Sequence, residues 1–179
     1  MVVNMADSSP VPGKSERAVM DAFIEMVQEE RYDHIRVSDI VRESAVGRST
    51  FYDHFRDKDD VLLHSMAGIF QILASAMDDS TSMERLEGIL LHFNENQQLA
   101  RSLMNSPSMK VVQRGLADAF AKRLTMNLSH PVPLVAMQLA DAVWSLVRSW
   151  LMNDSSISAR QLAEAMRKSV QAIFRAYTV

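Results

Sequence analysis

Residues 34–63 constrain the fold of this chain more than any other stretch, because two short amphipathic segments meet there at Ser44–Gly47. The first segment has apolar residues at i, i+3 and i+4, a spacing that places them on one side of a helix: Val37, Ile40 and Val41. Acidic and basic residues occupy its other side. This part of the chain is therefore expected to fold as a short helix with one buried face.

The second segment, Arg48–Phe55, carries two rings four residues apart, so Phe51 and Phe55 are expected to pack beneath the first helix. Its remaining positions hold side chains that can bond to phosphates or base edges: Arg48, Ser49, Thr50, Tyr52 and His54. Two such helices predict a helix-turn-helix whose second helix enters the DNA major groove. Arg48 is the candidate for a base contact, because a guanidinium can bond O6 and N7 of guanine together. The spacing alone also fits an amphipathic helix pair in any all-α protein.

Two local motifs stand out: a V-x-D-I segment and the string T-F-Y-x-H-F-x-x-K at Thr50–Lys58. Through them, residues 14–66 resemble the N-terminal domain of the tetracycline-repressor (TetR) family of transcriptional regulators. It implies an all-α fold, with a three-helix DNA-binding domain followed by a larger ligand-binding and dimerisation domain. It also implies which side chains meet DNA: Arg48, Ser49, Thr50 and Tyr52 face the groove, while His54 and Lys58 contact the backbone.

The chain departs from the family pattern before and within the turn. Arg36 stands where the family usually has a capping Thr, so we expect Ser38 to take over the cap and Arg36 to contact phosphate. The turn lacks its usual Gly, and Ala45 falls where a positive φ is expected, at a cost of roughly 1 kcal/mol. These changes keep the motif but can alter which operator is read.

Net charge supports DNA binding less directly than the motif does. The chain carries a formal charge of −3, and residues 14–60 hold eight Lys/Arg against twelve Asp/Glu. Between Arg31 and Lys58 the balance reverses to six against five. We therefore expect local, sequence-dependent binding with weak affinity for other DNA. The acidity leaves open an alternative, a TetR-fold nucleoid-associated or protein-binding factor without a small-molecule effector.

Composition indicates a small cytoplasmic regulator. The 179 residues are 47% hydrophobic, contain no Cys and include no apolar run near the ~18 residues of a membrane span. The N-terminus lacks the basic start and apolar core of a secretion signal. We expect a flexible tail over 1–13, the DNA-binding domain over 14–60 and the effector-binding and dimerisation domain over 61–179. About nine helices and no strands are expected, including one long helix over Asp59–Asp78.

The two C-terminal segments, Leu134–Met152 and Ser158–Tyr177, predict a subunit interface. The first is apolar over most of its circumference, which indicates burial on both flanks, in a monomer core or between two subunits. The family resembled forms dimers through a four-helix bundle of such helices. We therefore expect a homodimer with an interface that includes Val143, Val147, Trp150, Leu151, Val170 and Phe174.

An apolar or amphipathic effector is expected between these elements. Thirteen Met residues favour an adaptable apolar pocket, although Met is also common core filler. The candidate lining residues are Met77, Phe93, Met104, Phe120, Met137, Trp144 and Arg148. No cofactor, metal site or catalytic residue is expected, because the five histidines are scattered and no catalytic motif is present. Asp60 and His64 are four residues apart, a spacing that fits a metal pair but more often a surface contact.

Overall fold

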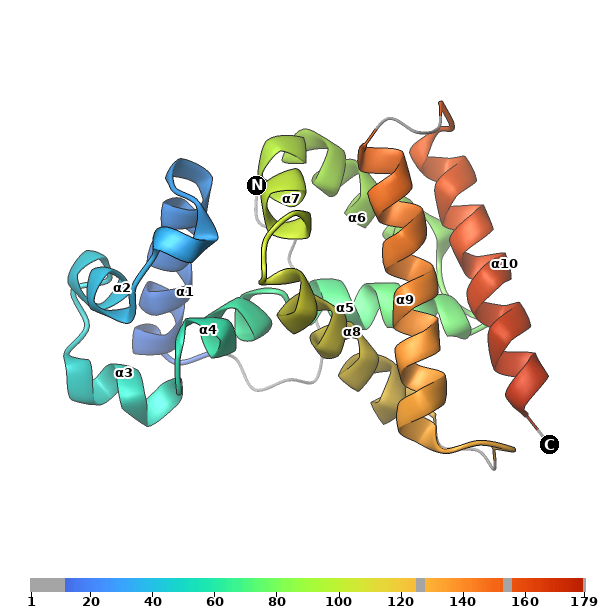
Figure 1. Ribbon diagram of the computed structural model, residues 1–179, viewed down its shortest axis with the longest axis horizontal. Coiled ribbons are helices and arrows are strands. Elements are labelled where there is room, and N and C mark those ends of the chain that lie inside the picture. The colour runs from blue at the N-terminus through green and yellow to red at the C-terminus, as the bar shows by residue number, and fades with distance from the viewer. Residues whose placement is uncertain (1–11, 125–127, 153–155, 179) are drawn as a thin grey trace. The chain divides into compact units, whose positions relative to one another are not determined.

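The computed structural model describes residues 12–124, 128–152 and 156–178, and the chain divides into two compact units, Met1–Gly68 and Ile69–Val179. Most of the predicted tail, residues 1–11, lies outside the described residues. The first unit contains four α-helices and a short 3-10 turn (Figure 1): α1 (Lys14–Glu29), η1 (Tyr32–His34), α2 (Val37–Glu43), α3 (Arg48–His54) and α4 (Lys58–Ser65).

In the first unit, α1 packs against α2, α3 and α4, and its buried face supplies Val19, Phe23 and Val27. The rings of Phe51 and Phe55 are 0% and 1% exposed, with their centroids 5.7 Å apart. Their predicted burial is confirmed. Full burial of a Phe side chain stabilises a fold by about 1.5–3 kcal/mol, so these two rings are a main source of stability for a unit this small.

Tyr32 and Lys58 connect η1 to the start of α4. The Tyr32 hydroxyl donates to the Asp59 carboxylate, and burial together with this carboxylate raises the tyrosine pKa far above its usual value. The Lys58 ammonium donates to the carbonyls of Tyr32 and Ile35 at 2.8 and 3.0 Å. It also lies 4.4 Å from the centroid of the Tyr32 ring, within cation–π range. These contacts fix the end of the helix-turn-helix against the rest of the unit.

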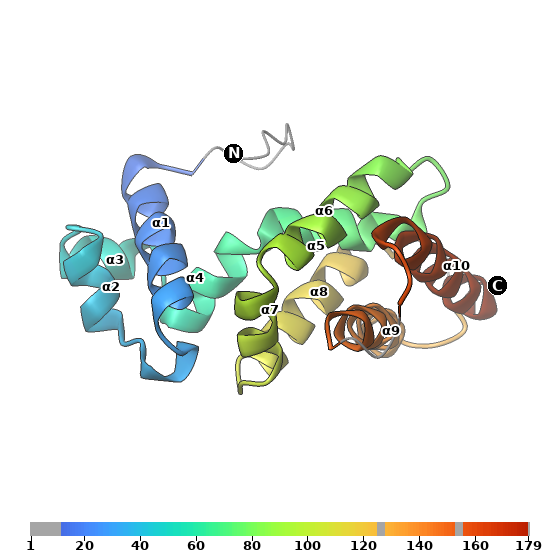
Figure 2. The same ribbon diagram turned by 90° about the horizontal axis from the view of Figure 1, so that it is seen from above.

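The elements after α4 are α5 (Ala67–Ala74), η2 (Ser75–Met77), α6 (Met83–Glu95), α7 (Gln97–Met104), α8 (Met109–Arg123), α9 (Val132–Leu151) and α10 (Ala159–Tyr177). The second unit is built around α9, which lies between α8 and α10 (Figure 2). Helix α6 packs on α10. Helix α7 packs on the end of α9, where Gln97 and Arg101 donate to the Leu151 carbonyl at 3.3 and 2.7 Å.

The described residues confirm the predicted all-α fold: their extended pairing is limited to one isolated bridge between Leu128 and Thr178. The single long helix predicted over Asp59–Asp78 is wrong. It is broken at Met66, whose N–H bonds to the carbonyls of both Leu62 and His64, a tightened end that terminates α4. No single helix in the described part of the chain is long and apolar enough to cross a membrane. Helix α4 and the segment Ala67–Met77 reach that length and apolar character only together, and they meet at a bend of 50°.

Candidate nucleic-acid interface

Helix α3 presents its polar side chains outward because its two Phe rings anchor the opposite side. Of the eight side chains predicted to meet DNA, Thr50 and Lys58 are half-buried; the other six are exposed, namely Arg36, Ser38, Arg48, Ser49, Tyr52 and His54. Helices α2 and α3 pack on each other, so these residues belong to one helix-turn-helix. Their exposure on adjacent helices is the arrangement that a DNA-reading surface requires.

Arg48 and Tyr52 form a pair on the exposed side of α3. The guanidinium carbon of Arg48 lies 5.7 Å from the centroid of the Tyr52 ring, and Tyr52 itself is 48% exposed. The ring of Tyr52 in turn meets Phe51 edge to face, with centroids 5.3 Å apart. Contact with a half-exposed aromatic ring restricts the arginine without consuming its hydrogen-bond donors, which leaves the guanidinium fork available to a base edge or phosphate.

Helix α2 begins at Val37, one residue before Ser38, the residue expected to cap it. Arg36 occupies the N-cap position, and its backbone N–H donates to the Asp39 carboxylate at 3.2 Å. Ser38 therefore lies within the first turn of the helix, and the prediction that it provides the cap is wrong. The physical reason is that Asp39 satisfies the start of the helix by half of a capping box, without a hydroxyl at the cap.

The turn between α2 and α3 contains the strained position predicted from the sequence. Ala45 has φ 52°, and it has this left-handed conformation alone among the described non-Gly residues. The N–H groups of Ser44 and Ala45 close the end of α2 on the carbonyls of Ile40 and Arg42 at 2.9 and 3.3 Å. A left-handed residue after a helix is usually Gly, since a Cβ there costs roughly 1–2 kcal/mol.

Replacing Ala45 with Gly is expected to stabilise the first unit by about 1 kcal/mol, since removal of the strained Cβ outweighs the added freedom of the unfolded chain. Chemical denaturation followed by circular dichroism measures this change. Ala18→Gly in the middle of α1 is the matched control and is expected to destabilise by about 1 kcal/mol. An equal loss in both variants would show that φ at Ala45 carries no strain.

The tertiary structure decides which basic side chains remain available to DNA. Arg31, Arg42 and Arg56 pair with Asp33, Asp39 and Asp60 at 3.6, 3.1 and 2.9 Å, and the Lys58 ammonium bonds to two carbonyls. The structure describes every residue from 31 to 58. Among the Lys and Arg side chains of this stretch, Arg36 and Arg48 are the two that form neither an ion pair nor a hydrogen bond from an ammonium group to a carbonyl. Positive charge is thus concentrated at the start of α2 and the start of α3, a distinction that a count of residues misses.

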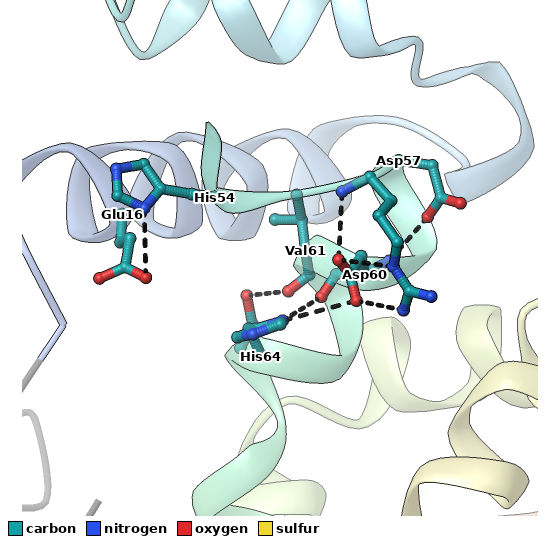
Figure 3. A network of polar contacts seen from close by, with 8 residues as sticks. Glu16, His54, Asp57, Asp60, Val61 and His64 are labelled. Atoms are coloured by element: carbon teal, nitrogen blue, oxygen red, sulfur yellow. Dashed lines mark hydrogen bonds and ion pairs between the residues drawn. The ribbon is translucent and has the colours of Figure 1, made fainter. Parts of the chain in front are cut away.

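The segment after α3 is held by a polar network around Asp60, which is 8% exposed (Figure 3). Its carboxylate accepts from the backbone N–H, Nε and Nη2 of Arg56 at 3.1, 3.2 and 2.9 Å. Hydrogen bonding from this guanidinium holds the pKa of Asp60 below its usual value. Asp57 caps α4 by accepting from the Asp60 N–H at 2.8 Å, and His64 Nδ1 lies 2.7 Å from the Asp60 carbonyl oxygen. The described residues contain no group of three side chains suited to a metal ion.

His54 and Lys58, both expected to contact the DNA backbone, differ in their surroundings. His54 lies 3.5 Å from the Glu16 carboxylate across the start of α1 (Figure 3). Lys58 uses two of its three N–H donors within the protein, and the third has no partner among the described residues. One donor is enough for a single phosphate contact, so the roles of His54 and Lys58 at DNA remain predictions.

The structure separates the residues expected to line an effector pocket. Two of the seven, Met137 and Arg148, lie exposed on α9, and Met137 is 38% exposed. The other five are buried in the second unit: Met77, Phe93, Met104, Phe120 and Trp144. Of these, Phe93 and Trp144 are in direct contact, with ring centroids 6.3 Å apart.

The residues expected at the dimer interface divide in a similar way. Four of the six are 0% exposed within the single chain: Val143, Val147, Leu151 and Val170. Trp150 and Phe174 remain partly accessible. Because α9 buries one side against its own chain, any intermolecular contact must use the opposite side, where Leu134 is 53% exposed. The burial on both flanks that the sequence suggested is provided in large part by α8 and α10.

Comparison with known proteins connects this geometry to a family. Residues 19–64 match the family described as bacterial regulatory proteins, tetR family. Over 50 residues the chain is 38% identical to an uncharacterized HTH-type transcriptional regulator, YxbF, from Bacillus subtilis strain 168. That alignment covers 27% of this chain and only 13% of the length of YxbF.

Solved structures resemble the chain over most of its length. A TetR transcriptional regulator from Streptococcus agalactiae 2603V superposes with a TM-score of 0.55 at 27% identity, covering 88% of this chain and 93% of that one. A TetR-family regulator from Syntrophomonas wolfei str. Goettingen gives 0.55 at 17% identity, with coverages of 89% and 94%. At 17% identity, the resemblance to the Syntrophomonas wolfei structure shows a shared fold alone.

Proposed function

We propose that this chain, whose residues 19–64 match the tetR family of bacterial regulatory proteins, is a cytoplasmic, dimeric repressor of that family that binds a pseudo-palindromic operator and responds to a small effector. In this proposal α3 enters the major groove and Arg48 contacts a base. His54, Lys58 and Arg36 hold the phosphate backbone. The second unit supplies the dimer contact and the effector site.

The observation that carries the proposal is the exposed Arg48–Tyr52 pair on α3. Arg48 has no intramolecular ion pair among the described residues, whereas three neighbouring arginines do. An exposed arginine held over an aromatic ring at the N-terminal end of the second helix is suited to bidentate contact with guanine. The net acidity of the chain opposes general DNA binding, so affinity must come from a few well-placed contacts of this kind.

Replacing Arg48 with Ala is expected to weaken operator binding by about 1–3 kcal/mol and to relax specificity at one base position. Selection of binding sites from random DNA first defines the operator, and fluorescence anisotropy then measures affinity for it and for single-base variants. Arg42→Ala is the matched control, since Arg42 is already paired with Asp39 at 3.1 Å and is expected to change affinity little. If Arg48→Ala bound the operator with wild-type affinity, the DNA-reading surface would lie elsewhere. If the selection returned many dispersed sites without a palindrome, a nucleoid-associated role would be favoured.

The dimer brings two recognition helices to one operator. Successive major grooves on one face of DNA are about 34 to 36 Å apart, so the repressing state must hold the two α3 helices at that separation. We assign the subunit contact to the outward sides of α9 and α10. Exposed Leu134 and the small side chains at Ala165, Ala172 and Ala176 support this assignment, because short side chains allow two helices to approach closely.

An effector acts in this proposal by preferring a different separation of the two α3 helices. Coupling is reciprocal, so a ligand that lowers operator affinity tenfold must itself bind operator-bound dimer tenfold more weakly, a difference of about 1.4 kcal/mol. Calorimetric titration of the same compound into free and operator-bound dimer measures both affinities. Equal affinities would mean that the compound fills a cavity without regulating DNA binding.

A further inference from the structure

Trp144 carries a buried hydrogen-bond donor without an acceptor. The side chain is 4% exposed, and its indole Nε1 has no partner among the described residues. Leaving a buried donor unbonded costs free energy, so native proteins rarely keep one without a use. The Arg123 Nε is also unbonded, but the same guanidinium donates to Asp78 at 2.7 Å. An indole has a single donor, so Trp144 has no such compensation.

The other tryptophan of the chain provides an internal comparison. Trp150 lies on the same helix, and its Nε1 donates to the Ile157 carbonyl at 2.9 Å. The half-buried indole of Trp150 is therefore satisfied by a nearby carbonyl. The difference between the two tryptophans is local to Trp144 and its surroundings.

Trp144 lies one layer below the protein surface. It shares a stripe of α9 with Met137, Asp141 and Arg148, all of which are exposed. Trp144 is covered instead by the ring of Phe93 on α6, with centroids 6.3 Å apart and planes inclined by 46°. Helix α7 begins four residues after Phe93 and is attached to the end of α9 through Gln97. We call this junction of α6 and α7 beside Phe93 the α6–α7 corner.

The charges near Trp144 select the kind of ligand. Asp141 and Arg148 lie three and four residues from Trp144 on the same stripe, and both are exposed, so their opposite charges offset each other at the surface. No Lys or Arg is buried among the described residues of the second unit, so a buried carboxylate would have no counter-charge. A neutral molecule with an oxygen acceptor satisfies the indole N–H without this cost.

We infer that the α6–α7 corner is a binding site for a neutral, mainly apolar molecule bearing a carbonyl-type acceptor, which bonds to Trp144 Nε1 and packs against Phe93. The inference rests on the proposed function in so far as the occupant is the effector. It assigns the polar contact to Trp144, whereas Arg148, the charged member of the expected lining set, lies exposed on the surface.

Acetophenone and ethylbenzene test the site because they have similar shapes and differ in the carbonyl acceptor. The full-length protein is labelled with 15N-tryptophan, and the two indole N–H resonances are assigned with Trp144→Phe and Trp150→Phe. Acetophenone is expected to shift the Trp144 indole proton downfield and to leave Trp150 unchanged. Ethylbenzene is expected to bind without this downfield shift, since it offers no acceptor.

Affinities from the same titrations isolate the hydrogen bond. Trp144→Phe keeps an aromatic ring but removes the donor, so it is expected to weaken acetophenone binding about five- to tenfold while ethylbenzene binding changes little. Trp150→Phe is the matched control and is expected to leave both affinities unchanged. Equal losses for the two probes, no downfield shift with acetophenone, or no binding of either probe would each overturn the inference.

These outcomes are separable from those of the proposed function. Operator affinity of the wild-type protein and of Arg48→Ala is measured without acetophenone or ethylbenzene. The proposed DNA contact is therefore tested independently of the proposed ligand site. Binding of acetophenone through Trp144 with no effect on operator affinity would establish the site and reject its coupling to DNA.

Discussion

Phe51→Ala is expected to unfold the first unit while the second unit stays folded. Phe51 is 0% exposed and contacts the ring of Phe55, so truncation leaves a cavity at the centre of a small core. Phe→Ala changes in such positions cost about 3–5 kcal/mol. A unit of this size has a total stability of similar magnitude, at roughly 0.05–0.15 kcal/mol per residue.

Hydrogen exchange read by mass spectrometry measures the two units separately, which a single melting temperature does not. Peptides from α1 to α4 are expected to lose protection in Phe51→Ala, and peptides from α8 to α10 to keep it. Tyr52→Ala is the matched control, because the neighbouring ring is 48% exposed and its removal leaves no buried cavity. Retained protection of α1 to α4 in Phe51→Ala would contradict the assignment of this ring to the core.

Ala172→Glu is expected to convert the proposed dimer into folded monomers. Ala172 is exposed on α10, so the substitution costs the isolated subunit little. In the proposed interface it buries two symmetry-related carboxylates, a penalty of about 4 kcal/mol or more, on the order of a thousandfold in the dissociation constant. Sedimentation velocity measures the oligomeric state, and operator affinity is expected to fall with it, since a monomer contacts one half-site.

Ser102→Glu on α7 serves as the matched control, since it places the same charge at an exposed helical position outside the proposed α9–α10 interface. It is expected to remain dimeric. Substitution of Val143 would be a poor test of the interface, because Val143 is 0% exposed within one chain and a charge there disrupts the subunit itself. An unaltered dimer in Ala172→Glu would move the subunit contact to another surface.

The sequence by itself determined the helix-turn-helix, because the features that define it are local. The four-residue spacing of Phe51 and Phe55 fixes which side of α3 is buried, and both rings are buried. The resemblance, which has a Gly in this turn, likewise predicted a positive φ at Ala45, and the structure has φ 52° there. Each of these inferences depends on residues within one or two turns of each other.

Tertiary structure decided the features that depend on which elements meet. Periodicity showed that α9 is apolar on nearly all sides, but it did not distinguish burial by α8 and α10 of the same chain from burial by a second subunit. Charge counting likewise did not reveal that Asp60 engages Arg56 or that Lys58 bonds to two carbonyls. The unbonded N–H of Trp144 is visible only once every neighbouring acceptor is placed. A sequence specifies which groups seek partners, whereas packing between distant segments decides which partners they find.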